Sequence, residues 1–152
     1  MYIIFDENVP IKIPEALRLL DATCNYYEIH TINELGLLGE KDIDLFPKLK
    51  QKAEEKHKKC ILITGDVNIF KRKPELQAFK NNKLVAFVLP PSYSNYPLWN
   101  RSVYILHLWK ALIEIASKAK EADIFKLPPY SKELSAKAIL NYQRQFNRKY
   151  KK

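Results

Sequence analysis

The sequence predicts an α/β sandwich with a mostly parallel sheet. Short apolar runs alternate along the chain with segments of helical periodicity, and most of these runs are apolar at every position, which is typical of buried parallel strands. The length of 152 residues suits one hydrophobic core, and a hydrophobic content of 47% is too high for a disordered chain. We therefore expect a folded α/β domain.

The first half of the chain predicts two strands and two helices. Residues 2–5 form an apolar run that stops abruptly at Asp6, as a buried strand does at its end. Pro14 is tolerated only in a first turn, so the next helix should begin near residue 13. A second strand is expected over 27–32. After a loop over 36–39, an amphipathic helix should start at Asp42 with four residues inward: Ile43, Phe46, Leu49 and Ala53.

The second half predicts further elements and a basic extension. They are expected, in chain order, over 60–64 (strand), 74–80 (helix), 84–89 (strand) and 100–119 (mainly buried helix). Residues 126–130 resemble a hinge before a last helix over about 132–149. Residues 130–152 contain seven basic residues and one acidic residue. We therefore place one domain over 1–120 and a C-terminal basic helical extension over 121–152.

Charge is unevenly distributed along the chain. Residues 1–50 contain nine acidic and five basic residues, whereas the rest contains 21 basic and eight acidic ones, for a total of +9. Such a division suggests a cation-binding site beside a surface for a polyanion. The alternative is a globular protein of high pI without a nucleic-acid partner.

Several classes of protein are not supported by the motifs. Three glycines cannot form the usual glycine-rich nucleotide loops, and the scattered His and Cys residues lack zinc-site spacing. No apolar stretch has the length of a membrane span, and the start lacks the basic region of a signal peptide. We expect a cytoplasmic protein that does not contact the membrane.

Carboxylates recur where the predicted strands end. Asp6 follows the first strand directly, and Asp66 follows the strand over 60–64 after one glycine. If these strands are parallel neighbours, their ends lie about 4.8 Å apart, in the crevice where open α/β folds bind ligands. Asp42 opens a helix and can reach the same region. Each acid alone could be a turn or cap residue, but together they predict an oxygen-only site for Mg²⁺ or Mn²⁺.

Basic and aromatic side chains are candidates for contact with a nucleic acid. Those expected to bind phosphates lie near the acids or on the C-terminal helix: Lys41, Lys71, Arg72, Lys73, Arg144 and Arg148. The aromatic loop over 90–99 could stack on unpaired bases through Tyr93, Tyr96 or Trp99, although these are equally good core residues.

Three motifs follow one another along the chain: FDEN (5–8), INELGLLGEKDID (32–44) and ILITGDVNIF (61–70). Their residues and their order resemble those of PIN-like nuclease domains, a group that includes toxins of bacterial and archaeal toxin–antitoxin operons. The resemblance covers roughly residues 2–90 and implies a three-layer α/β/α sandwich. It matches Asp6, Asp42 and Asp66 to the family's metal-binding acids and Glu7 to a position that is often acidic.

The resemblance implies a metal-dependent endoribonuclease that is the toxin of a type II toxin–antitoxin system. A metal ion would activate a water for attack on an RNA phosphodiester, and Asn68 or Glu7 would complete the coordination or orient the water. RNA, an antitoxin and a second copy of the chain are the implied partners. Because Asn68 stands where the family has a further Asp, a weakened module that binds RNA or a protein without cleavage stays open. Another Mg²⁺-dependent phosphotransfer enzyme and a DNA substrate also stay open.

Overall fold

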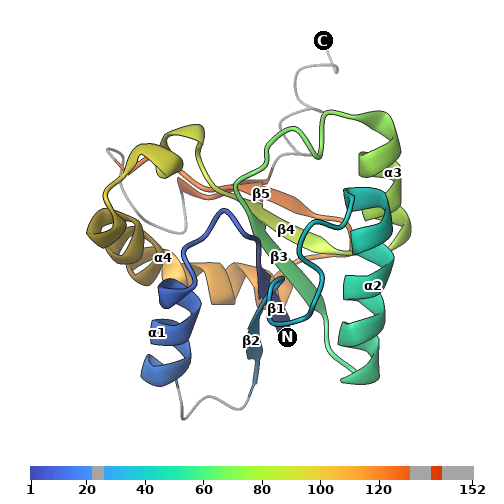
Figure 1. Ribbon diagram of the computed structural model, residues 1–152, viewed down its shortest axis with the longest axis horizontal. Helices are drawn as coiled ribbons and strands as arrows, with labels where there is room; N and C mark the ends of the chain where they lie inside the picture. The colour runs from blue at the N-terminus through green and yellow to red at the C-terminus, as the bar shows by residue number, and fades with distance from the viewer. Residues whose placement is uncertain (22–25, 131–137, 142–152) are drawn as a thin grey trace.

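The computed structural model describes residues 1–21, 26–130 and 138–141. Within these ranges a sheet is covered on both faces by helices (Figure 1). The elements, in chain order, are β1 (Tyr2–Phe5), α1 (Lys12–Leu20), β2 (Glu28–Thr31), α2 (Asp42–Glu55), β3 (Cys60–Thr64), α3 (Lys73–Asn81), β4 (Val85–Val88), the 3₁₀ helix η1 (Pro91–Asn95), α4 (Leu98–Lys118), β5 (Ile124–Lys126) and β6 (Leu140–Asn141).

The strands form one sheet in the order β2-β1-β3-β4-β5-β6. All neighbouring pairs from β2 to β5 are parallel, and β6 runs antiparallel to β5. Helices α1 and α4 lie on one side of the sheet, and α2 and α3 lie on the other (Figure 1). The expected three-layer α/β/α sandwich with a mostly parallel sheet is therefore confirmed.

Each central strand contributes side chains to both layers of the core. In β1, Ile3 and Phe5 belong to the cluster under α1 and α4, whereas Tyr2 and Ile4 belong to the cluster under α2 and α3. All four residues are buried, as the uninterrupted apolar run predicts. No helix in the described ranges is both long and apolar enough to cross a membrane.

The inward face of α2 differs from the expected one at a single position. Phe46, Leu49 and Ala53 are buried as expected, but Ile43 is 49% exposed and Leu45 is buried instead. An α-helix turns by about 100° per residue, so Ile43 lies about 200° around the helix from Leu45. The core therefore takes the Leu45 side of this turn, and the prediction for Ile43 was wrong.

The chain beyond residue 120 extends the sheet. The hinge expected over 126–130 begins inside β5, whose backbone pairs with the edge of β4. Leu140–Asn141, which were expected in this helix, form β6 and pair with β5. The edge of β5 offers unpaired backbone groups, and the pattern of apolar residues in the sequence does not reveal such an edge. The rest of the helix expected over 132–149, with Arg144 and Arg148, lies outside the described residues. The division at 120 stays a prediction, although β5 and β6 join the same sheet.

Lys59 ties the end of α4 to the start of β3. Its Nζ donates hydrogen bonds to the carbonyl oxygens of Ala116, Ser117 and Ala119 at 3.1, 3.2 and 2.8 Å. The last carbonyls of a helix have no partner within the helix and carry partial negative charge. The ammonium group satisfies both needs and fixes α4 on the sheet.

Replacing Lys59 should therefore weaken the fold. We expect Lys59→Met to lower the free energy of unfolding by about 1 kcal/mol, since it removes charged hydrogen bonds from a partly exposed helix end. Urea denaturation measures the change. The matched control is Lys110→Met, which replaces an exposed lysine of α4. Equal stability of the two variants would contradict this role of Lys59.

Candidate functional site

The carboxyl ends of β1 and β3 lie side by side. The parallel register pairs Phe5 with Ile63, and the Asp6 N–H donates to the Ile63 carbonyl at 2.9 Å. The chain leaves β1 for β2 on one side and reaches β3 on the other, so this edge is the topological switch point of the sheet. The acids that follow the two strands are thereby brought to the place where open α/β sheets bind ligands.

Thr64 connects the two loops that carry these acids. Its side chain is fully buried, and its hydroxyl donates to Asp6 Oδ2 at 2.6 Å while accepting the Asp66 N–H at 3.1 Å. Thr64 was not among the site residues predicted from the sequence. The available signal was a hydroxyl residue at the end of an apolar strand, directly before Gly65 and Asp66.

Gly65 lets the loops after β1 and β3 pack closely. A Cβ at this position would lie 3.1 Å from Asn8 Cβ, which is tighter than ordinary contact. Asn8 itself donates from Nδ2 to Asp6 Oδ2 at 3.1 Å. A side chain on Gly65 would therefore push on a residue that holds Asp6 in place.

The loops after β1, β2 and β3 and the start of α2 line a hollow of about 240 Å³. It is lined by Asp6, Glu7, Asn8, Ile32, Leu37, Gly39, Glu40, Asp42, Leu45, Asp66 and Ile69. The structure thus brings together four of the expected site residues, namely the three aspartates and Glu7. It adds Glu40, which was not among the predicted site residues. The loop before α2 that carries Glu40 turns at Gly36 and Gly39, whose φ angles are 70° and 79°.

A family model described as a PIN-like domain matches residues 1–91. The chain belongs to the PIN-like domain family. The matched segment contains β1 to β4 and every residue that lines the hollow, whereas α4, β5 and β6 lie outside it. Comparisons with curated proteins and with solved structures gave no match. PIN-like domains are usually nucleases, so the family supports a nuclease-type fold for this chain.

The aspartates of this PIN-like domain interact electrostatically. The pKa of Asp42 is raised above its ordinary value, first because burial removes water from the carboxylate and second because the charge of Asp66 repels it. Asp6 and Glu75 raise this pKa further, and the guanidinium of Arg72 acts in the opposite direction. The site therefore concentrates negative charge, which favours a bound cation.

This electrostatic strain predicts how stability depends on pH. Because the pKa of Asp42 is higher in the folded than in the unfolded protein, the folded state binds more protons between these two values, and ionisation of Asp42 lowers stability as pH rises through them. Without metal, we expect Asp42→Asn to be more stable than wild type at pH 7 and to lose this advantage as pH falls through both values. Thermal unfolding in EDTA across pH checks this, and a constant difference would contradict it.

The basic residues expected to bind phosphates lie in different places. Arg72 faces the acids: its Nη2 lies 3.5 Å from Asp42 Oδ2 and 3.9 Å from Asp66 Oδ2, and its Nε lies 3.1 Å from Glu75 Oε1. Lys41 precedes the first residue of α2, and Lys73 is the first residue of α3; both are exposed. Arg72 is therefore a partner of the carboxylates in this structure.

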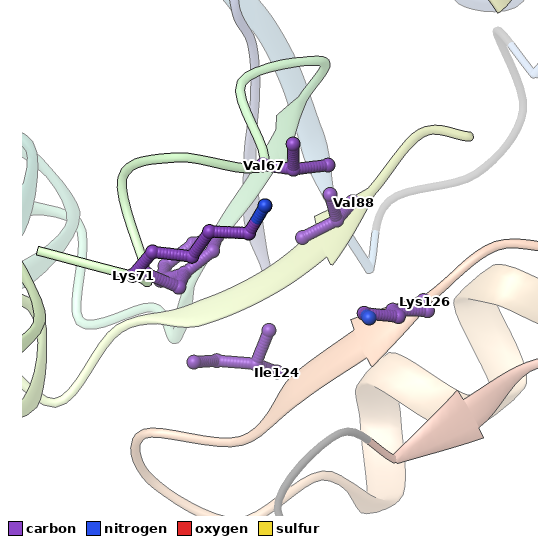
Figure 2. Close-up of a pocket in the computed structure, with 6 residues that line it drawn as sticks. Val67, Lys71, Val88, Ile124 and Lys126 are labelled. Carbon is purple, nitrogen blue, oxygen red and sulfur yellow. The ribbon is translucent and has the colours of Figure 1, made fainter. Parts of the chain in front are cut away.

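Lys71 lines a second, smaller pocket of about 30 Å³. Its other lining residues are Val67, Phe70, Val88, Ile124 and Lys126. Figure 2 shows Lys71 and Lys126 on opposite sides of the pocket, with their nitrogen atoms directed toward the space between them. Two ammonium groups beside this pocket suit an anion. Lys126, on β5, was not anticipated.

Two other expectations meet different outcomes. Asn68 is exposed and does not line the hollow, although its backbone N–H donates to Asp66 Oδ1 at 2.8 Å. Tyr93 is only 2% exposed and packs against Tyr104, so stacking of Tyr93 on a base is wrong. Trp99 is 78% exposed, and its stacking stays a prediction.

The donor atoms of the hollow suit a hard divalent cation, but in the described residues they do not converge on one point. Carboxylate oxygens are the ligands that Mg²⁺ and Mn²⁺ prefer. In the part of the chain that the structure describes, however, no group of three or more His, Cys, Asp or Glu side chains is arranged to hold a metal ion. Hydrogen bonds engage both oxygens of Asp6, and Arg72 pairs with Asp42 and Asp66. The carboxylates are therefore of the type that binds such a cation, but they can converge on one ion only if these hydrogen bonds and ion pairs change.

Proposed function

We propose that this PIN-like domain is a metal-dependent endoribonuclease that hydrolyses RNA phosphodiester bonds. The observation that carries the proposal is the hollow at the switch point, where three separate segments supply Asp6, Asp42 and Asp66. These three residues would hold Mg²⁺ or Mn²⁺. Bound there, the cation would acidify a water and neutralise charge that develops on the phosphate.

The chain's own residues would position the reactants. Thr64 holds Asp6 and the backbone of Asp66 in fixed relation, so that the acids enter the hollow from neighbouring strands. Glu7 lines the hollow and would orient the attacking water, while Asn68 supports Asp66 through its backbone N–H. Lys41, Lys71 and Lys73 would hold the RNA strand, which the net charge of +9 favours.

Within this proposal the protein is the toxin of a type II toxin–antitoxin system, a role that rests on the resemblance of its motifs to such toxins. An antitoxin that covers the hollow would block access to Asp6, Asp42 and Asp66 together. Arg144 and Arg148 would contribute to the surface for RNA or for the antitoxin, and the protein would also form a homodimer.

A module that binds RNA or a partner protein without cleavage is the second candidate. Two observations favour it: Asn68 supplies no charge, and Arg72 neutralises part of the charge on Asp42 and Asp66. Both would weaken the binding of a metal ion. In such a module the acidic hollow would serve recognition only.

The deciding experiment is the metal dependence of RNA cleavage. Labelled tRNA and a single-stranded RNA of mixed sequence are incubated with the protein in Mg²⁺, Mn²⁺ or EDTA. We expect cutting with either metal, none in EDTA, and fragments with 5′-phosphate ends. Cutting that persists in EDTA would contradict the proposed cofactor. A folded protein that binds RNA in a salt-dependent way and cuts under none of these conditions supports the second candidate.

A further inference from the structure

Arg72 lies where a cation would compensate the acids of the hollow. Its guanidinium contacts three carboxylates that belong to α2, to the loop after β3 and to α3, namely those of Asp42, Asp66 and Glu75. The contact with Asp42 also meets the geometry of a hydrogen bond, at 3.5 Å. One side chain thus bridges segments that are far apart in the sequence, since Asp42 lies 30 positions before Arg72.

The three contacts differ in strength. The bond to Glu75 is short, at 3.1 Å, and involves a side chain that is only 16% exposed. The contacts with Asp42 and Asp66 are longer, at 3.5 and 3.9 Å, and the Arg72 side chain is 53% exposed. Glu75 therefore anchors the guanidinium, while the contacts with the two aspartates are weak enough to be exchanged.

We propose that Arg72 is an exchangeable counter-ion that competes with a divalent cation for Asp42 and Asp66. This inference rests on the proposed function, because it takes the same carboxylates to be metal ligands. In the metal-free protein Arg72 compensates their repulsion. When a cation binds, the carboxylates leave Arg72, which stays attached to Glu75 at the rim of the hollow.

Release would give Arg72 a second role. A guanidinium presents several N–H donors in one plane and binds phosphate oxygens in pairs. Once Asp42 and Asp66 turn to the metal, these donors become available beside the place where the scissile phosphate would lie. The metal and the binding of the RNA backbone would then be coupled through one side chain.

The first test measures coupling in the metal-free protein. Arg72→Gln, Asp42→Asn and the double variant are unfolded by urea in EDTA at pH 7. We expect Arg72→Gln to raise the unfolding equilibrium constant about threefold more in wild type than in Asp42→Asn, because only wild type loses the pair. The comparison cancels the lost contact with Glu75. Equal effects in both backgrounds would overturn the counter-ion role.

The second test measures competition directly by titration calorimetry with Mn²⁺. We expect Arg72→Gln to bind Mn²⁺ about threefold to tenfold more tightly than wild type, since no guanidinium has to be displaced. Lys73→Gln removes the same charge from the next residue, which forms no ion pair with these acids in the described part of the structure. This variant should change the affinity for Mn²⁺ by less than twofold.

The outcomes separate this inference from the proposed function. Mn²⁺ binding that is equally tight in wild type and Arg72→Gln overturns competition and leaves the metal site intact. A gain of the same size in Lys73→Gln reduces the effect to general charge and also overturns it. If neither wild type nor Arg72→Gln binds Mn²⁺, the proposed cofactor fails together with the competition.

Discussion

Asp66→Asn should lower the rate of RNA cleavage by about 100-fold or more while the protein stays folded. Loss of a metal-binding carboxylate removes several kcal/mol of charge stabilisation from the transition state, and each 1.4 kcal/mol, roughly, corresponds to a factor of ten. The rate is measured on labelled single-stranded RNA at saturating Mg²⁺.

Asp66 is a better choice than Asp6 for this experiment. Its Oδ1 accepts the Asn68 N–H, and the carbonyl oxygen of an asparagine can accept the same bond. Asp6, in contrast, also accepts from the buried hydroxyl of Thr64, so its replacement disturbs the fold as well. A melting temperature no lower than that of wild type and retained RNA affinity of Asp66→Asn provide the control. Cleavage at the wild-type rate would exclude Asp66 from the proposed site.

Thr64→Val should impair both stability and cleavage. Valine has nearly the same shape, but it leaves Asp6 Oδ2 without one donor and the Asp66 N–H without its acceptor. Because both hydrogen bonds are partly buried, their loss should lower the free energy of unfolding by about 1 kcal/mol. Cleavage should fall at least tenfold, since 1.4 kcal/mol of lost positioning, roughly, has that effect. Urea denaturation and cleavage assays measure the two changes.

The matched control for Thr64 is serine. Thr64→Ser keeps the hydroxyl and removes only a methyl group, so cleavage should stay within a few-fold of wild type even where stability falls by about 1 kcal/mol. Similar cleavage by the serine and valine variants would show that the methyl group matters and the hydroxyl does not, contrary to the role derived for Thr64.

The local pattern of the sequence was a good guide to most elements. Apolar runs located β1, β3 and β4, and the prolines indicated where α1 and α3 begin, because burial and backbone restrictions act on neighbouring residues. The same logic placed Asp6 and Asp66 at one edge of the sheet, and both line the hollow with Asp42. Their catalytic roles and the identity of the metal stay predictions.

Contacts between distant segments were not visible in the pattern. The strands β5 and β6 are three and two residues long, too short to show alternation, and they form because β4 and then β5 offer an open edge. Arg72 looked like its neighbours Lys71 and Lys73 in a basic run. Because α2, β3 and α3 pack together, Arg72 contacts carboxylates, whereas Lys71 lines an apolar pocket.

The sequence by itself determined the fold class, the family and the edge of the sheet at which the acids gather, since these follow from periodicity and from the order of motifs along the chain. The tertiary structure alone decided how those acids are held. The Thr64 hydroxyl reaches Asp6 across 58 positions, and the Arg72 guanidinium reaches Asp42 across 30. Hydrogen bonds and ion pairs depend on distances of a few ångströms between side chains, and only the packed fold sets such distances for residues far apart in the chain.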